Sequence, residues 1–284
     1  MKLPFTLEHG VYGPRASLTG PWVPAVSEYM RRENIRELYL NYARGWKGED
    51  LSFLETLPDL LGFSIIDFGI SDIARVHTLT ALRALEISTY CSTPIDFARF
   101  PDLERTVFYW RSGSDSLFDL IKLRSLFVHR YVGSVSEPFG RLTTLTELSI
   151  ANSDLLEIES VRQLSHLRFL GLYNLKKLKS LRGLQALFHL EALDVNGCKK
   201  LESINELKPL TKLRRLHLND DGKVDSLRPL QGLTELEELL FYESTNVVDG
   251  DLAVIKELPR LKKISFQNRR HYSHRREDFQ FSDA

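Results

Sequence analysis

The sequence is poor in cysteine, with only Cys91 and Cys198 among 284 residues. The two lie more than a hundred positions apart, in different copies of a repeat described below, so we expect no disulfide between them. Proteins without disulfides are typical of reducing compartments. The cysteine content therefore predicts a cytoplasmic protein.

Long apolar runs are also absent. No uninterrupted apolar stretch approaches the roughly 18 residues that indicate a membrane span. The first residues, MKLPFTLEHGVYGPR, are interrupted by Pro4, Glu8 and Gly10, whereas a secretory signal needs a continuous apolar segment. We expect a soluble protein with no signal peptide and no membrane partner.

Charge of one sign is not in excess, because 38 basic residues balance 38 acidic ones. A balanced chain has no global field that attracts nucleic acid or anionic lipid. The local exception is residues 269–276, a basic run with interleaved aromatic residues that could bind phosphate groups. Because Glu277 and Asp278 follow directly, we favour a C-terminal cap that packs through Tyr272 and Phe279.

Catalytic and metal-binding motifs are missing as well. The sequence has no G-x-S-x-G, no H-E-x-x-H, no phosphate loop and no dinucleotide fingerprint. The acids of residues 219–225 do not alternate as calcium ligands do, so this run predicts a polar turn. His271 and His274 lack a third ligand. We expect no metal, no cofactor and no enzymatic activity.

What the chain does have is an internal repeat. An apolar residue followed by others at +3 and +5 recurs eleven times, and the clearest copies follow one another at intervals of 22 or 23 residues. The clear copies begin at Leu145, Leu167, Leu190, Leu213 and Leu236. Weaker copies begin at Ile35, Leu60, Leu82, Leu103, Leu123 and Leu261. A fixed period of this length indicates stacked repeats that share one continuous core.

Each repeat predicts one short strand and a return segment. In the copy that begins at Leu167, Leu170 and Leu172 alternate as the inward side chains of a strand do. Leucines then continue at every third position from Leu175 to Leu190. A period of three suits a 3₁₀ or polyproline-like path. Stacking such units places parallel strands on one side and irregular turns on the other.

The L-x-x-L-x-L pattern over residues 35–266 resembles the leucine-rich repeat superfamily, in its short 22–23-residue form. The resemblance implies an α/β, right-handed solenoid with a curved parallel sheet on its concave face. The ninth repeat position, often Asn in this superfamily, varies here, which puts an asparagine ladder in doubt. That position holds Ser153, Leu175, Cys198, Asp221 and Ser244. Residues 193–204 resemble the cysteine-bearing variant, which implies that Cys198 packs inside the turn.

The ends differ from the middle of the array. We expect an N-terminal segment and helical cap at residues 1–34, the repeats at 35–266, and a C-terminal cap or tail at 267–284. Residues 1–20 contain several glycines and prolines, so we expect irregular structure there. For residues 21–33 we expect a helix that covers the edge of the first repeat strand.

A second helix is predicted within the return segment that begins near Asp249. Asp249 is a candidate helix cap, and Leu252, Ile255 and Leu258 follow at helical spacing.

Exposed strand positions are the candidate binding residues, since solenoids bind partners on their concave surface. We take the residue between the two inner apolar positions and the two residues that follow. By this rule the fourth and fifth repeats, together with Tyr173 of the repeat that begins at Leu167, predict an aromatic and basic cluster. Its members are Tyr109, Trp110, Phe127, His129, Arg130 and Tyr173. Tyr, Trp and Arg most often dominate binding energies.

An alternative interpretation stays open, because Thr106 breaks the inner pattern of the fourth repeat. A slip of one residue would turn Val107 and Tyr109 inward. The site would then lie in a second group, flanked by acidic residues that could instead form a solvated ladder of charge pairs. This secondary partner-binding group comprises Arg214, Arg215, His217 and Tyr242.

These features predict a non-enzymatic, monomeric scaffold that binds another protein on its concave face. In the leucine-rich repeat superfamily most members are binding scaffolds, and catalysis comes from an attached domain. Flanks of 34 and 18 residues are too short to hold one. Two alternatives remain: the recognition part of an effector or ligase whose catalytic domain is absent here, or a phosphate- or nucleic-acid-binding protein that uses the basic tail.

Overall fold

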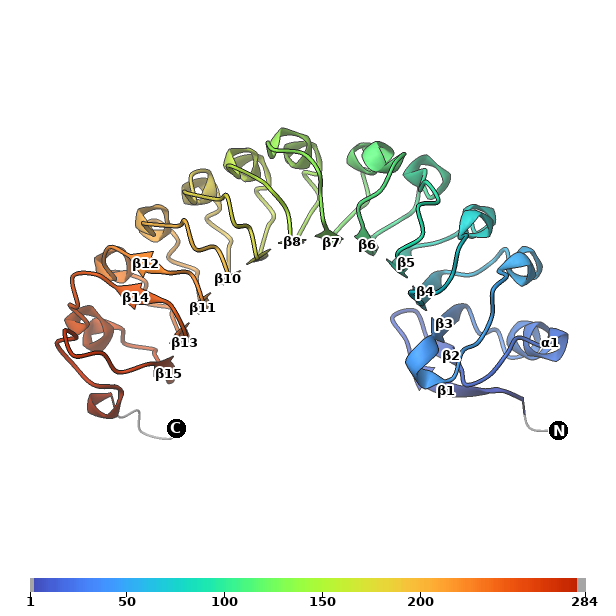
Figure 1. Ribbon diagram of the computed structural model, residues 1–284, viewed down its shortest axis with the longest axis horizontal. Coiled ribbons are helices and arrows are strands. Elements are labelled where there is room, and N and C mark those ends of the chain that lie inside the picture. Colours follow the sequence, from blue (N-terminus) through green and yellow to red (C-terminus); the bar gives the residue numbers. More distant parts are fainter. Residues whose placement is uncertain (1–2, 280–284) are drawn as a thin grey trace. The chain divides into compact units, whose positions relative to one another are not determined.

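The computed structural model describes residues 3–279 and divides into two units, Met1–Val128 and His129–Ala284, which are treated separately below. In each unit short strands line one side and 3₁₀ turns line the other (Figure 1). We call these the strand side and the turn side. This is the repeated strand-and-turn arrangement of a solenoid, as the sequence predicts.

The first unit forms a sheet in the order β1-β2-β3-β4-β5-β6. Strands β2 to β6 run parallel, and β1 pairs with β2 in antiparallel fashion. Strand β7, Ser125–His129, spans the boundary between the units. The bounds are β1 Phe5–His9, β2 Pro14–Leu18, β3 Glu37–Asn41, β4 Gly62–Ile66, β5 Ala84–Ser88 and β6 Arg105–Tyr109.

The register of the first unit stacks the weaker repeat copies on one another. Leu38, Phe63, Leu85 and Thr106 lie opposite one another on β3 to β6, and each is at most 2% exposed. Thr106 therefore occupies an inward position although it is polar, because its neighbours in the row are buried and the strand keeps its register.

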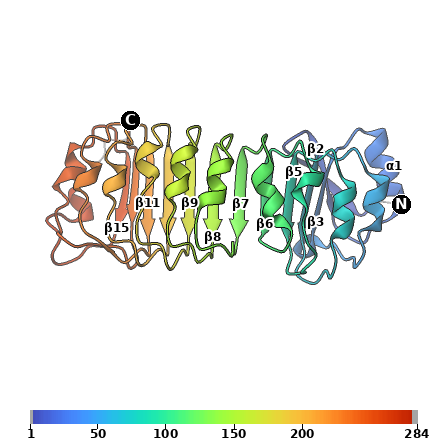
Figure 2. The same cartoon turned by 90° about the horizontal axis from the view of Figure 1, so that it is seen from above.

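The second unit forms a parallel sheet in the order β8-β9-β10-β11-β13-β15, with its strands side by side (Figure 2). Leu148, Leu170, Leu193, Leu216 and Leu239 lie in register in a single, fully buried row, which confirms the predicted stacking. The bounds are β8 Glu147–Ala151, β9 Phe169–Tyr173, β10 Ala192–Asn196, β11 Arg215–Asn219, β13 Glu238–Phe241 and β15 Lys263–Phe266. A separate two-stranded ladder, β12 Lys223–Val224 with β14 Asn246–Val247, was not predicted.

The return segments are 3₁₀ turns, as the period of three predicts. In the first unit they are η1 Tyr42–Arg44, η2 Ser52–Thr56, η3 Ala74–Thr78, η4 Phe97–Arg99 and η5 Ser114–Asp119. In the second they are η6 Glu137–Arg141, η7 Glu159–Gln163, η8 Leu184–Ala186, η9 Asn205–Leu207, η10 Arg228–Leu230, η11 Ala253–Glu257 and η12 Arg276–Asp278.

The helix predicted after Asp249 is wrong, because Ala253–Glu257 is a 3₁₀ turn. Leu252, Ile255 and Leu258 are buried at intervals of three, which matches the three residues per turn of a 3₁₀ helix. The Asp249 carboxylate accepts a hydrogen bond from the backbone NH of Asp251, two residues on, within the preceding turn.

The N-terminal segment differs from the prediction in two ways. Residues 5–18 form the β1–β2 hairpin instead of irregular structure. The predicted helix is present as α1, Pro24–Arg32, with Val26 and Met30 fully buried and Pro24 at its first turn. It does not cover the edge of β3, however, since β2 hydrogen-bonds that edge directly.

The turns after β8, β9, β10 and β11 each begin with one residue at positive φ. These residues are Asn152, Asn174, Gly197 and Asp220. The next position is buried by different means from one repeat to another: the Ser153 hydroxyl donates to the Tyr131 carbonyl at 2.7 Å, and the Cys198 thiol donates to the Leu172 carbonyl at 3.7 Å. A regular asparagine ladder is thus replaced by a mixed one, and Cys198 packs inside the turn.

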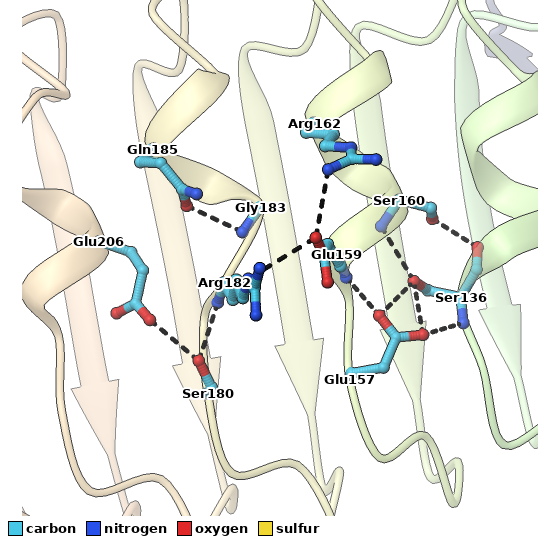
Figure 3. A network of polar contacts seen from close by, with 10 residues as sticks. All are labelled: Ser136, Glu157, Glu159, Ser160, Arg162, Ser180, Arg182, Gly183, Gln185 and Glu206. Carbon is cyan, nitrogen blue, oxygen red and sulfur yellow. Dashed lines mark hydrogen bonds and ion pairs between the residues drawn. The ribbon is translucent and has the colours of Figure 1, made fainter.

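Polar side chains tie neighbouring turns together on the turn side of the second unit (Figure 3). The Glu157 carboxylate accepts hydrogen bonds from the backbone NH of Ser136 at 2.7 Å and from its hydroxyl at 3.0 Å. The Ser160 NH donates to the Ser136 hydroxyl at 3.2 Å. Because these contacts occupy the buried Ser136 hydroxyl and the half-buried Glu157 carboxylate, we assign the network a structural role.

The basic tail packs against the last repeat. The rings of Tyr272 and Phe279 each lie 6.0 Å from the ring of Phe266 on β15. The Arg269 guanidinium donates to the backbone carbonyls of Glu243 and Thr245, at 2.8 and 3.1 Å. These contacts are those expected of a cap, and its effect on stability stays a prediction. Residues 280–284 of the predicted tail lie outside the described part of the chain.

Candidate functional site

The predicted cluster is divided between the two units. Tyr109 ends β6, Trp110 follows it, and Phe127 lies at the centre of β7, all three half-buried in the first unit. His129, Arg130 and Tyr173 belong to the second unit. That all six form one surface stays a prediction.

Strand β6 has not slipped. Thr106 and Phe108 are buried and lie opposite Leu85 and Ile87 of β5, so Val107 and Tyr109 face the strand side. The alternative interpretation is therefore wrong for this strand. Trp110 is not fully available, because its ring lies 5.7 Å from the buried ring of Phe118.

The second-unit members of the cluster have distinct surroundings. Arg130 is exposed and takes a left-handed backbone conformation, with φ 56°. Burial, and then the charge of Arg130, lower the pKa of His129. The Tyr173 ring covers Gly171, where an added Cβ would lie 2.6 Å from it, and burial raises the pKa of its hydroxyl to about 12. The Tyr173 ring therefore packs over Gly171, and a side chain at position 171 would displace it.

A row of aromatic rings on the first unit was missed. The rings of Tyr42 and Phe68 have centroids 5.8 Å apart, those of Phe68 and Tyr90 4.6 Å, and those of Tyr90 and Tyr109 5.8 Å. The side chains of Tyr42, Phe68 and Tyr90 are 53, 38 and 59% exposed. We call these four residues the aromatic row.

The aromatic row lies at the carboxyl ends of β3 to β6, because each member ends its strand or follows it by one or two residues. The signal was in the sequence: Phe68 and Tyr90 each stand one position beyond the window used to select exposed strand residues. Single exposed apolar side chains are ordinary, but contiguous ones indicate a binding surface.

A buried arginine fixes the backbone behind the aromatic row. Arg111, 9% exposed, donates to the carbonyl of Tyr109 at 3.1 Å, and to those of Thr89 and Cys91 at 3.1 and 3.2 Å. These bonds hold both sides of Tyr90. The rings of Tyr90 and Tyr109 are thereby presented on a preorganised support, which lowers the entropy lost on binding.

The secondary group is largely neutralised by acids of its own unit. Arg214 pairs with Glu237, and Arg215 lies 3.4 Å from Asp194. His217 lies between two carboxylates, 3.2 Å from Asp194 and 3.1 Å from Glu238.

These side chains form the ladder of cross-strand charge pairs that was the alternative interpretation, and exposed pairs contribute little energy. Tyr242, 37% exposed, follows the carboxyl end of β13, whereas Arg214 precedes the amino end of β11. The structure therefore does not bring Tyr242 together with Arg214.

The candidate metal residues have other roles. His271 contacts the carbonyl of Val247 at 3.0 Å, and His274 packs on Phe279. Asp221 is fully buried and accepts the backbone NH of Cys198 at 2.8 Å. Within residues 3–279 no group of three or more His, Cys, Asp or Glu side chains could hold a metal ion. Across that same range, no helix has the length and apolarity needed to cross a membrane.

Comparison with known proteins gives structural matches only. No protein-family model and no curated protein sequence matches the chain. An internalin from Listeria monocytogenes superposes with a TM-score of 0.60 at 18% identity, covering 90% of this chain and 83% of that one.

The Arabidopsis receptor kinase HAESA, solved with the peptide hormone IDA and the co-receptor SERK1, gives 0.57 at 16% identity, over 82% of this chain and 43% of the receptor chain. The leucine-rich repeat ectodomain of HAESA with an extended IDA peptide gives 0.58 at 17% identity, over 76% and 40%. At these identities the likeness concerns the fold, and it agrees with the stacked, in-register rows of buried residues in both units. The chain therefore has the fold of a leucine-rich repeat protein.

Proposed function

We propose that the protein is a non-enzymatic interaction module that binds another protein through its strand side. The observation that carries the proposal is the aromatic row, in which Tyr42, Phe68 and Tyr90 expose adjoining rings to solvent. Exposed, contiguous aromatic side chains on a rigid support are the usual anchors of protein interfaces.

The structural neighbours support this general role. HAESA, which shares the fold, was solved with a bound peptide hormone. The predicted cluster extends the proposed surface: Tyr109 belongs to the aromatic row as well, and Trp110 and Phe127 are half-buried in the same unit. A monomeric state and a cytoplasmic location stay predictions.

The basic tail gives weaker support to a phosphate-binding function. The Arg269 guanidinium donates to backbone carbonyls, and the Arg276 guanidinium lies 3.6 Å from the Glu277 carboxylate. A tail that binds nucleic acid would need these guanidinium groups to reach phosphates. We therefore favour the protein partner.

The test begins with affinity capture from the native lysate and continues with binding measurements on the purified partner. Phe68→Ala and Tyr90→Ala should each weaken binding by at least about 2 kcal/mol, roughly thirtyfold, because each removes a desolvated anchor. Trp110→Ala and Phe127→Ala should do the same if the cluster contributes.

The matched control is Phe188→Ala, since Phe188 is 60% exposed but lies in the return segment after η8. This control should bind as the wild type does. Affinities that stay unchanged for both Phe68→Ala and Tyr90→Ala would contradict the proposal. Circular dichroism checks that each variant is folded.

A further inference from the structure

A loop of the N-terminal hairpin crosses the strand side of the first unit. The Tyr12 backbone NH donates to the Glu37 carboxylate on β3, and the Tyr12 hydroxyl donates to Glu104 at 3.1 Å, just before β6. The Arg83 guanidinium lies 4.8 Å from the centre of the Tyr12 ring. Residues 10–13 are therefore attached to the repeats of β3, β5 and β6.

Beneath this loop lies a cavity of about 170 Å³. Its floor includes Gly62 and Ala84, which lie side by side in the row that runs from Glu37 to Arg105. An added Cβ on Gly62 would come within 2.8 Å of the Glu37 side chain. Gly62 thus leaves room for the Glu37 side chain, which a larger residue at this position would displace.

Glu86, at the centre of β5, lines this cavity. Burial raises the pKa of its carboxyl group, and a hydrogen bond from Ser64 and the charge of Arg15 only partly oppose this. Within residues 3–279 no basic side chain lies within ion-pair distance of Glu86. Ionisation of this carboxyl group is therefore less favourable than in water, because the two contacts offset only part of the effect of burial.

The other charged side chains that line the cavity are Arg15, Glu37 and Arg105. The Arg15 guanidinium donates to Glu8 at 2.9 Å, Glu37 accepts the Tyr12 NH, and Arg105 is exposed and takes part in contacts of its own. Glu86 is consequently the acidic group of the cavity with capacity for a new ion pair. In a partly desolvated position, an opposite charge within about 4 to 6 Å strongly favours the ionised carboxylate.

We propose that the cavity accepts a cationic side chain, lysine or arginine, from the partner protein, and that Glu86 is its counter-ion. This inference rests on the proposed protein-binding function and specifies its partner chemistry. The cation enters beside the loop of residues 10–13 and pairs with the Glu86 carboxylate. The aromatic row supplies apolar anchors at the carboxyl ends of the same strands, and Glu86 supplies charge selectivity.

The test is an NMR titration of the full chain with ¹³C-labelled glutamate. The probes are N-acetyl-lysine-N-methylamide, N-acetyl-arginine-N-methylamide and the neutral N-acetyl-norleucine-N-methylamide. At saturation, one or both cationic probes should lower the pKa of Glu86 by at least about one unit, because the cation stabilises its ionised form. Norleucine should leave it unchanged.

Variants identify the binding group. Glu86→Gln, which is nearly isosteric, should abolish binding of the cationic probes. The control Glu28→Gln changes an exposed carboxyl group on α1 and should retain it. A Glu86 pKa that neither cationic probe moves, or that norleucine moves equally, overturns the inference.

Failure of this inference differs from failure of the proposed function. With the purified partner, Glu86→Gln should weaken binding at least tenfold. If Phe68→Ala and Tyr90→Ala weaken binding while Glu86→Gln and the probes have no effect, the interaction module stands and the cation site is wrong. If the cationic probes lower the pKa but the aromatic variants bind normally, the cation site stands and the proposed aromatic surface is wrong.

Discussion

Asp221 should make the protein less stable as the pH rises, and Asp221→Asn should remove the effect. Its side chain is fully buried, one carboxylate oxygen accepts the Cys198 NH at 2.8 Å, and the other has no partner within the described residues. Burial, with a smaller contribution from the charge of Asp220, raises the pKa of the Asp221 carboxyl to about 7.

The sign of the effect follows from proton binding. Below about pH 4 the carboxyl is protonated in both the folded and unfolded states, since an unfolded Asp has a pKa of about 3.9. Between about pH 4 and pH 7 only the folded state retains the proton. Stability present at low pH is therefore lost as the pH rises, until the folded group also ionises.

The magnitude follows from the difference between the two pKa values. Roughly three units at about 1.4 kcal/mol each amount to about 4 kcal/mol. Asn keeps the oxygen that accepts from Cys198 and never ionises. We expect Asp221→Asn to match the wild type in unfolding free energy near pH 4 and to exceed it by about 3 to 4 kcal/mol at pH 8.

Urea unfolding followed by circular dichroism at pH 4, 6 and 8 measures this difference. Asp225→Asn, at an exposed position of the same segment, is the control and should show no such trend. If the stability difference between Asp221→Asn and the wild type is the same at all three pH values, Asp221 does not titrate between the states and the reasoning fails.

Two further predictions concern the repeat array. Leu193→Ala, in the buried row of the second unit, should cost about 2 to 5 kcal/mol in urea unfolding through lost burial and a residual cavity, and a cost below about 1 kcal/mol would mean the site is loosely packed. Deleting residues 269–284 should lower the melting temperature and promote self-association, because Tyr272 and Phe279 no longer cover Phe266. Unchanged stability together with loss of salt-dependent RNA binding would instead favour the phosphate-binding function.

The repeats could be predicted because their information is local. Each inward position recurs at +3 and +5, and one register places Leu170 against Leu193 and Leu193 against Leu216. Even Thr106 follows this rule, since pairing with the neighbouring strand sets the register of β6 and the polarity of Thr106 does not change it. The return turns followed from the same spacing, and the helix at Ala253–Glu257 was wrong because its period of three was taken for a helical one.

The hairpin and the aromatic row depended on information that the repeat pattern does not contain. Pairing of Phe5 with Leu18 is a contact between strands outside the repeat. Phe68 and Tyr90 stand beyond the strands, where the turn backbone and the buried Arg111 decide how a ring is presented. The cavity at Glu86 required the loop of residues 10–13 to lie across other strands, which no sequence spacing indicates.

The in-register rows of the second unit also bear on how such a protein can evolve. Because Leu170, Leu193 and Leu216 are spaced by 23 residues and lie opposite one another, duplicating or deleting one such segment keeps the register and the buried leucine row. Each event would lengthen or shorten the sheet by one strand, about 4.8 Å. The size of the surface offered to a partner can therefore change in fixed steps, while substitutions at outward positions change its chemistry independently of the core.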